Sequence, residues 1–202
     1  LIQVSNNSFK KQKVFGEVKI ILRNIMFLIK KFFARKRYWY FLPKKFRYFI
    51  WNIKTLKKYN THTGQYYLPA FAFQDGIRNK IINNEITDIK VFNKLKNFIL
   101  PNTIVLDLGA NFGQMSNLWS QQKPNVKVYA FEASTYVFKI LKKNVLINSC
   151  NVEPINALVG NKSIKNQLIR KSSLKEYPTY GTNKIEEVQS SSNENTDKIK
   201  AI

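Results

Sequence analysis

The sequence predicts an α/β domain with a mostly parallel, doubly wound sheet, preceded by a basic helical extension. Two observations predict this fold class. From residue 104 to residue 159, short apolar runs alternate with amphipathic segments, which is the order of parallel strands joined by helices. Ahead of them, residues 18–58 combine lysine, arginine and aromatic side chains with apolar residues at helical spacing. We therefore expect an extension at 1–61 and a ligand-binding domain at 62–202.

The composition is that of a folded chain with a strong positive charge. Of 202 residues, 44% are hydrophobic and 14% aromatic, which allows a packed core and excludes wholesale disorder. Cys150 is the only cysteine, so an internal disulfide is excluded, and we expect an inert core thiol in a reducing compartment. No secretory signal is visible, and the apolar run 25–29 is far short of the roughly 18 residues that span a bilayer. These features favour a cytoplasmic protein.

The formal net charge of +22 is unevenly distributed. No acidic residue lies between Lys19 and Gly64, and eight basic residues fall in Lys30–Arg47, interleaved with aromatic side chains. Three interpretations stay open: an extension packed on the domain with solvated lysines, peripheral attachment to the inner face of a membrane, and contact with nucleic acid. The abundance of Lys, Asn and Ile also fits the composition of an A/T-rich genome.

The extension and the start of the domain are predicted from local signals. Pro43 divides residues 18–58 into two helices. Residues 63–65 predict a turn, and the short strand after it ends at Pro69. Residues 81–100 predict a helix, which Pro101 and Asn102 end.

The rest of the domain alternates between strand and helix patterns. Strands are predicted at 104–108, 126–131 and 152–159. Helices are predicted between them, at 111–122 and 136–148. A further edge strand is a candidate at 167–170, and a loop is predicted at 189–197. Because three parallel strands leave a doubly wound sheet unfinished, we expect the chain to be truncated at its C-terminus.

The segment Val105–Gly113, with the sequence VLDLGANFG, carries the chemistry. An apolar strand runs into a glycine turn that opens a helix, and such turns lie at the carboxyl edge of a parallel sheet, where ligands bind. Gly109 can adopt backbone angles that other residues avoid, and it lets a ligand approach the main chain closely. Gly113 lets the new helix pack close to the strand. The helix N-terminus is expected to offer free N–H groups to an anion.

The spacing of this turn argues against a phosphate-binding loop. A dinucleotide fingerprint needs Gly-x-Gly-x-x-Gly, whereas this sequence has Gly109-x-x-x-Gly113, with Ala110 and Asn111 between the glycines. A P-loop is excluded because no Gly-Lys-Ser/Thr follows. Asp107, two residues before the first glycine, would repel a pyrophosphate. It suits a ligand with an ammonium group, such as the methionine moiety of S-adenosylmethionine.

Glu132 is the second anchor, because it ends the next predicted strand. A carboxylate at this position can accept hydrogen bonds from both hydroxyls of a ribose. Glu132 alone also suits NAD, so the glycine spacing and Asp107 discriminate between the two ligands. The third strand ends at Asn156 and Ala157, where the adenine edge is expected. In the simpler interpretation, the glycines only make a strand–helix turn and Glu132 is a solvated strand end.

Together these motifs resemble the FkbM family of methyltransferases. The resemblance is carried by Asp107–Ser116 and Val128–Ala133, and Gly64–Pro69 and Asn156–Gly160 fit it too. It covers residues 62–202 and implies a Rossmann-like class I methyltransferase fold, with S-adenosylmethionine as donor and a hydroxyl oxygen as acceptor. The cofactor site implied by the resemblance would be lined by Asp107, Gly109, Asn111, Gly113 and Glu132. A later strand with an Ile-Asp-Val-Glu-Gly-like sequence, usual in the family, is absent here.

The expected function is O-methyl transfer to a hydroxyl of a sugar, glycan or lipid-linked acceptor. Two alternatives stay open: an RNA methyltransferase that uses the basic N-terminal segment, and a non-catalytic membrane-surface or interaction protein with a methyltransferase-like fold. His62, the only histidine, is a chemically sensible general base, but a lone surface histidine is usually not catalytic. Glu85 is more simply explained as a helix cap. No residues have metal-ligand spacing, so no metal is expected.

Overall fold

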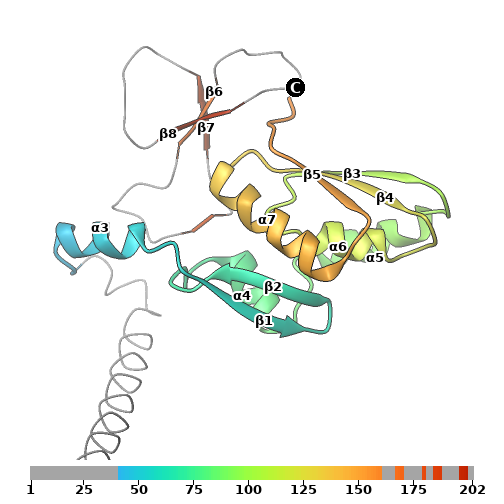
Figure 1. Ribbon diagram of the computed structural model, residues 1–202, viewed down its shortest axis with the longest axis horizontal. Helices are drawn as coiled ribbons and strands as arrows, with labels where there is room; N and C mark the ends of the chain where they lie inside the picture. Colours follow the sequence, from blue (N-terminus) through green and yellow to red (C-terminus); the bar gives the residue numbers. More distant parts are fainter. Residues whose placement is uncertain (1–40, 161–166, 171–178, 181–183, 188–195, 200–202) are drawn as a thin grey trace, which may run out of the picture. The chain divides into compact units, whose positions relative to one another are not determined.

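The structure is a computed structural model, drawn in Figure 1. The chain divides into two compact units, 1–43 and 44–202. The first predicted helix of the extension and most of Lys30–Arg47 lie outside the residues that the structure describes, which are 41–160, 167–170, 179–180, 184–187 and 196–199.

The second predicted helix of the extension is present but shorter than expected. Helix α3 (Lys44–Asn52) begins directly after Pro43 and ends well before residue 58. The residues that follow form β1 (Leu56–Thr61), which pairs antiparallel with β2 (Gly64–Pro69) in a hairpin. In β1, Lys57, Lys58 and Asn60 are exposed, and the other three side chains are partly buried. The boundary expected between residues 61 and 62 falls within this hairpin, so β1 belongs with the domain.

The single helix predicted at 81–100 is wrong, because the chain turns in the middle of it. The structure has α4 (Gly76–Ile82), α5 (Ile89–Leu95) and a short 3₁₀ turn, η1 (Lys96–Phe98). Asp75 caps α4 by accepting a hydrogen bond from the N–H of the third helical residue at 2.8 Å. Asn84 adopts a left-handed φ of 62° after α4, a conformation that asparagine tolerates better than most residues.

The predicted parallel sheet is confirmed. Strands β3 (Ile104–Leu108), β4 (Lys127–Phe131) and β5 (Val152–Ile155) pair in that order, all parallel (Figure 1). Helices α6 (Gln114–Ser120) and α7 (Thr135–Asn148) connect them. Each new strand is added on the same side of the previous one, which is the arrangement of one half of a doubly wound domain. The α/β fold class is therefore as predicted, although α6 and β5 are shorter than expected.

Strand β6 (Gln167–Arg170) does not extend the parallel sheet. It pairs antiparallel with β7 (Lys184–Glu187) on one side and with β8 (Thr196–Ile199) on the other. The expectation for 167–170 is therefore right about the strand and wrong about its sheet.

Helix α7 packs between two apolar clusters. Leu141 contributes to a cluster with the buried faces of β4 and β5, and Val137 and Ile140 contribute to a cluster with β2 and α4. All three side chains are buried. The helix thereby ties the hairpin to the parallel sheet.

Helix α7 also covers the outer edge of β2 with two asparagines. The side-chain amide of Asn144 accepts the Tyr67 N–H at 2.7 Å and donates to the Tyr67 carbonyl at 3.2 Å. Asn148 makes the same pair of bonds with Gln65, at 2.8 and 2.7 Å. The two asparagines are four residues apart, a rise of about 6 Å along the helix, and their partners are two residues apart, about 6.8 Å along the strand. Because these spacings are similar, each amide lies opposite one of two alternate strand residues. The helix thus substitutes for a neighbouring strand and holds the hairpin in register.

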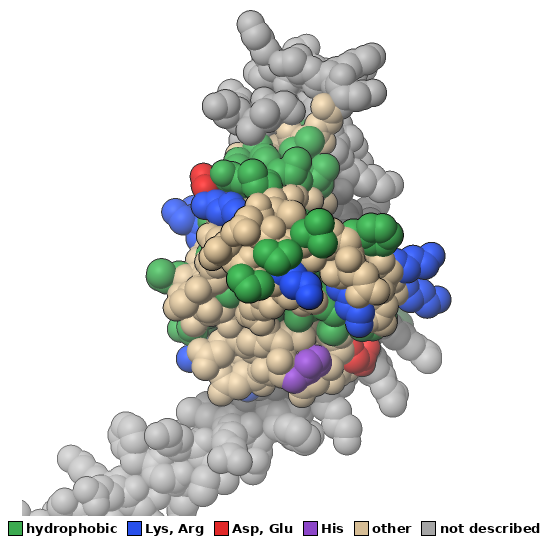
Figure 2. All heavy atoms as spheres, turned by 90° about the vertical axis from the view of Figure 1, so that its right-hand side faces the viewer, with side chains coloured by type: hydrophobic (Ala, Val, Ile, Leu, Met, Phe, Trp, Pro, Cys, Tyr) green, Lys and Arg blue, Asp and Glu red, His purple; other side chains and the backbone are tan. Residues whose placement is uncertain are grey.

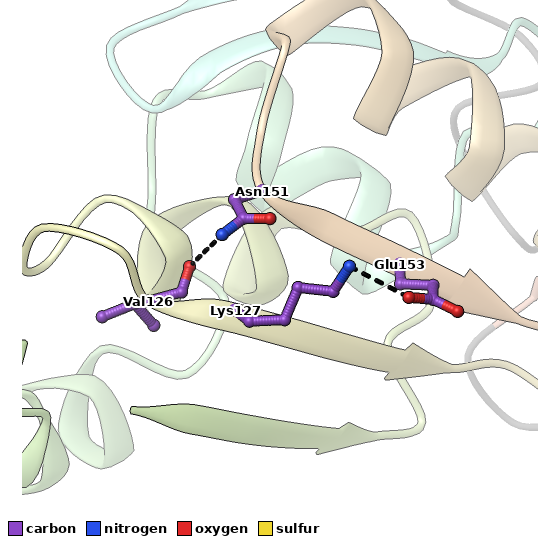
Figure 3. Close-up of polar contacts among 4 residues, drawn as sticks. All are labelled: Val126, Lys127, Asn151 and Glu153. Atoms are coloured by element: carbon purple, nitrogen blue, oxygen red, sulfur yellow. Dashed lines mark hydrogen bonds and ion pairs between the residues drawn. The ribbon is translucent and has the colours of Figure 1, made fainter. Parts of the chain in front are cut away.

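One face of the parallel sheet carries α6 and α7, and the other face is exposed. Ile104, Leu106 and Leu108 of β3 point to this second face and are 58–65% exposed. On the same face, Lys127 of β4 and Glu153 of β5 form an ion pair at 2.9 Å (Figure 3). Hydrophobic side chains also reach the surface in the view of Figure 2.

Candidate cofactor-binding site

The glycine turn lies where it was expected, at the carboxyl ends of β3 and β4. The backbone N–H groups of Gly109 and Ala110 both donate to the carbonyl of Phe131, each at 2.9 Å, and so attach the turn to the last residue of β4. Gly109 has a φ of 85° and Gly113 a φ of 86°, in the left-handed region that favours glycine. Both glycines are therefore required by the backbone of the turn.

Glu132 connects this turn to the start of α7. It follows β4 directly and is only 8% exposed, so it is not a solvated strand end. Its Oε2 accepts the backbone N–H of Asn111 at 3.0 Å, and its Oε1 accepts the backbone N–H of Ser134 at 2.8 Å. Each carboxylate oxygen has a further acceptor direction, so the side chain is held in one orientation while it can still accept bonds from a ligand.

Asn156 and Ala157 close the site at the end of β5. The Asn156 side chain donates to the carbonyl of Glu132 at 2.8 Å and to that of Ala133 at 3.2 Å. Ala157 is buried, with 2% of its surface exposed. Asn156 therefore fixes the main chain around Glu132 in this structure, in addition to the adenine contact expected of it.

Asp107 lies on the helix-facing side of β3 and is half-buried. Its Oδ2 accepts a hydrogen bond from the Ser116 hydroxyl of α6 at 2.5 Å. It also lines a pocket of about 390 Å³, whose wall includes Asp88, Met115 and Trp119. Glu132 is not among the residues that line this pocket.

The two carboxyl groups share an environment that disfavours negative charge. Burial raises the pKa of Glu132; the N–H groups of Ser134 and Asn111 act against this, and the charge of Asp107 adds to it. Burial also raises the pKa of Asp107. The hydrogen bond from the Ser116 hydroxyl lowers this pKa, and the negative charge of Asp88 raises it further. Because ionising both groups costs free energy, a positively charged ligand group near them would be favoured.

The raised pKa of Glu132 predicts how folding stability changes with pH. The folded state binds this proton more tightly than the unfolded chain does. Its contribution to the free energy of unfolding is therefore present below the ordinary pKa of roughly 4 and is lost as the pH rises through the raised value. We expect the stability of Glu132→Gln, measured relative to that of the wild type, to increase as the pH rises from acidic to neutral.

Urea unfolding at several pH values measures this difference. Glu153→Gln is the matched control, because it removes one carboxylate from a half-exposed ion pair. If the stability difference between wild type and Glu132→Gln does not change with pH, the assigned environment of Glu132 is incorrect.

The N–H groups of the turn that precedes α6 are all used within the chain. Each backbone N–H from 109 to 113 donates within the chain: to the carbonyl of Phe131, to the Glu132 carboxylate, to the Asn111 side chain and to the carbonyl of Ala110. The reason is that the turn folds back on itself, with Asn111 at a left-handed φ of 49°. An anionic ligand group would have to use N–H groups further into α6.

The other candidate residues lie away from these contacts. His62 is exposed in the turn between β1 and β2, and its N–H donates to a side chain in the loop after α4 (Figure 2). Glu85 is not a helix cap, because it lies in the loop between α4 and α5, and the residue that precedes α5 is Asp88. Cys150 is half-buried, its thiol contacts the side-chain oxygen of Asn117, and burial raises its pKa, in agreement with an inert thiol.

The structure adds residues that the sequence did not single out. Ser116 bonds Asp107 through its hydroxyl, and Ser134, at the N-cap position of α7 where serine is common, bonds Glu132 through its backbone N–H. Tyr180 had no local sequence signal. Its N–H donates to Asp75 at 2.6 Å, its carbonyl accepts from the Asn111 side chain at 3.5 Å, and its ring lies 5.0 Å from that of Tyr136.

Comparisons with known proteins give limited similarity. No protein-family model and no curated protein matches the chain. Among solved structures, Trm5b from Pyrococcus abyssi is similar over 55% of this chain and 33% of its own, with 18% identity and a TM-score of 0.37. TYW2 from M. jannaschii in complex with AdoMet is similar over 55% of this chain and 53% of its own, with 19% identity and a TM-score of 0.37. The chain thus spans from a third to about half of these proteins.

Neither a metal centre nor a membrane-spanning helix is found in the part of the chain that the structure describes. No group of three or more His, Cys, Asp or Glu side chains there is arranged to hold a metal ion. None of the helices there combines the length and the apolar composition that crossing a membrane requires.

Proposed function

We propose that this chain binds S-adenosylmethionine and is the cofactor-binding part of an O-methyltransferase similar to the FkbM family. The observation that supports this most is the Glu132 carboxylate, buried at the carboxyl end of β4 and hydrogen-bonded to the backbone of the glycine turn. A buried acid in this position, next to a Gly-x-x-x-Gly turn, suits ribose hydroxyls on a ligand that lies over the sheet edge.

The charge of the site favours this ligand over a dinucleotide. Asp107 is close enough to Glu132 to raise its pKa, so two acidic groups act on the same edge of the sheet. A pyrophosphate would add negative charge to this environment, and the internally bonded N–H groups of 109–113 would not compensate for it. An ammonium or sulfonium group would lower the cost of ionising both acids.

Each residue has a role in this proposal. Glu132 would accept bonds from the ribose hydroxyls, and Asn156 keeps the main chain around it in place. Asp107, oriented by Ser116, would face the cationic part of the ligand. When bound, S-adenosylmethionine would supply an activated methyl group, so the chain mainly has to orient the reactants and exclude water. The acceptor we propose is a hydroxyl of a sugar, glycan or lipid-linked molecule.

Calorimetric titration of the full chain with S-adenosylmethionine and with NAD tests the proposal. We expect S-adenosylmethionine to bind at least about tenfold more tightly than NAD, a difference of about 1.4 kcal/mol. Tighter binding of NAD would overturn the methyltransferase assignment. If a chain shown to be folded by circular dichroism binds neither ligand, the non-catalytic alternative replaces it.

A further inference from the structure

The exposed surface of α3 has an unusual composition for a helix on a globular domain. Phe46 is 42% exposed and Phe49 62% exposed. They are three residues apart, so they lie on the same side of the helix, and their rings stack with centroids 6.3 Å apart and planes at 23°. Lys44 and Lys45 are exposed in the first turn of the helix, and Lys45 lies four residues before Phe49 and so on the same side as that ring. Ile50 points inward and is only 9% exposed. The helix thus presents an aromatic and basic face outward.

The charge around α3 identifies the kind of partner. Residues 18–74 contain thirteen lysines and arginines and no aspartate or glutamate. The six that follow Pro43 and lie among the described residues are Lys44, Lys45, Arg47, Lys54, Lys57 and Lys58. Such a segment is complementary to a surface of dense negative charge. Tyrosine and tryptophan, also frequent in it, favour the interface between water and lipid.

We propose that α3 is a docking surface for an anionic lipid bilayer. Phe46 and Phe49 would enter the boundary between headgroups and acyl chains, and Lys44 and Lys45 would contact the headgroups, as interfacial amphipathic helices do. The helix has nine residues, so it lies on the membrane and does not cross it.

The exposed apolar area of α3 favours lipid as the partner. Phe46 and Phe49 are 42% and 62% exposed, and their rings are offset with centroids 6.3 Å apart, so they offer apolar surface that can insert among lipids. The exposed apolar face of β3, formed by Ile104, Leu106 and Leu108, is not accompanied by a cluster of basic residues like that around α3. Its charged neighbours Lys127 and Glu153 neutralise each other in an ion pair (Figure 3).

Co-sedimentation of the full chain with vesicles tests this surface. We expect binding to phosphatidylcholine vesicles that contain about 30% phosphatidylserine to be at least about tenfold stronger than binding to phosphatidylcholine alone, and to weaken with added salt. Phe46→Ser/Phe49→Ser should lose at least about tenfold, and Lys44→Gln/Lys45→Gln about fivefold. Phe46→Leu/Phe49→Leu should stay within about threefold of the wild type, because insertion requires apolar area and not aromatic rings.

Matched controls separate this surface from general effects. Phe98→Ser removes a phenylalanine that is 79% exposed on η1, and Lys142→Gln/Lys143→Gln removes the same charge from α7. Both should bind vesicles within about twofold of the wild type. Equal binding by Phe46→Ser/Phe49→Ser and the wild type would overturn the proposal. The proposal would also be overturned if the wild type bound single-stranded RNA but not vesicles, and if Phe46→Leu/Phe49→Leu lost this binding to RNA.

Discussion

Replacing Glu132 by glutamine is expected to weaken the binding of S-adenosylmethionine by about ten- to a hundredfold. Hydrogen bonds to a charged group contribute about 1.5–3 kcal/mol each, and the variant has no charge to offer the ribose hydroxyls. The side chain keeps its size, so the replacement creates no cavity. Calorimetric titration of both proteins at neutral pH measures the ratio of the two dissociation constants.

The expected loss has a second, structural component. In the wild type, the two oxygens of Glu132 accept the N–H groups of Asn111 and Ser134. Glutamine keeps one oxygen and presents an NH₂ group to one of these donors, so the turn itself is expected to loosen. The unfolding midpoint in urea, measured without ligand, separates this effect from the lost ligand contact.

Glu153→Gln is the control for the affinity measurement, because it also removes one negative charge from a neighbouring strand. Glu153 pairs with Lys127 on the opposite, exposed face of the sheet. Its replacement is expected to leave the affinity within about twofold of the wild type, since surface ion pairs contribute little. If both variants lose affinity equally, the effect is one of net charge, and Glu132 does not contact the ligand.

Local patterns in the sequence predicted the elements that build this site. Val105–Leu108, with apolar residues around one acid, predicted β3, and the glycines after it predicted the turn. Glu132 was predicted at the end of the next strand, and it is there, directly after the last paired position of the parallel sheet. These features depend on residues close together in the chain, so periodicity and turn chemistry are sufficient to find them.

The parts that were missed depend on contacts between distant residues. Asn144 bonds to Tyr67, 77 residues away, and nothing in the helix pattern of 136–148 indicates that its asparagines cover a strand edge. The break between α4 and α5 depends on Asn84 adopting a left-handed conformation that most asparagines do not adopt. Residues 167–170 were predicted as a strand, but the choice of partner strand is a tertiary property.

The hydrogen bonding of the turn's N–H groups also depends on contacts beyond the local sequence. A glycine turn before a helix suggests free donors, but whether they are free depends on the nearest acceptors. Here Phe131 and Glu132, at the end of the next strand along the chain, supply two of those acceptors. The sheet therefore holds the turn in its shape. A ligand can contact only those atoms of the turn that these internal hydrogen bonds leave accessible.

Replacing Gly113 by alanine is expected to lower the free energy of unfolding by about 2–5 kcal/mol. A left-handed backbone costs a non-glycine residue about 1–2 kcal/mol, and overpacking a core costs about 1–3 kcal/mol more. Gly113 has a φ of 86°, and a Cβ there would lie 2.6 Å from Cδ1 of Leu141. Leu141 is fully buried, so it has little room to move away. Urea denaturation measures the change.

Gly109→Ala is the matched comparison, because Gly109 has nearly the same left-handed φ, 85°, but no atom within 4 Å of the added Cβ. It is expected to lose only about 1–2 kcal/mol of stability, since the strain is the sole cost. The added methyl group would project into the open space beside the turn, where the ligand is expected to lie. Gly109→Ala is therefore expected to weaken the binding of S-adenosylmethionine although the variant stays folded. Equal destabilisation of the two variants would mean that Leu141 does not constrain the start of α6. Unchanged affinity in Gly109→Ala would mean that the ligand does not approach the turn at Gly109.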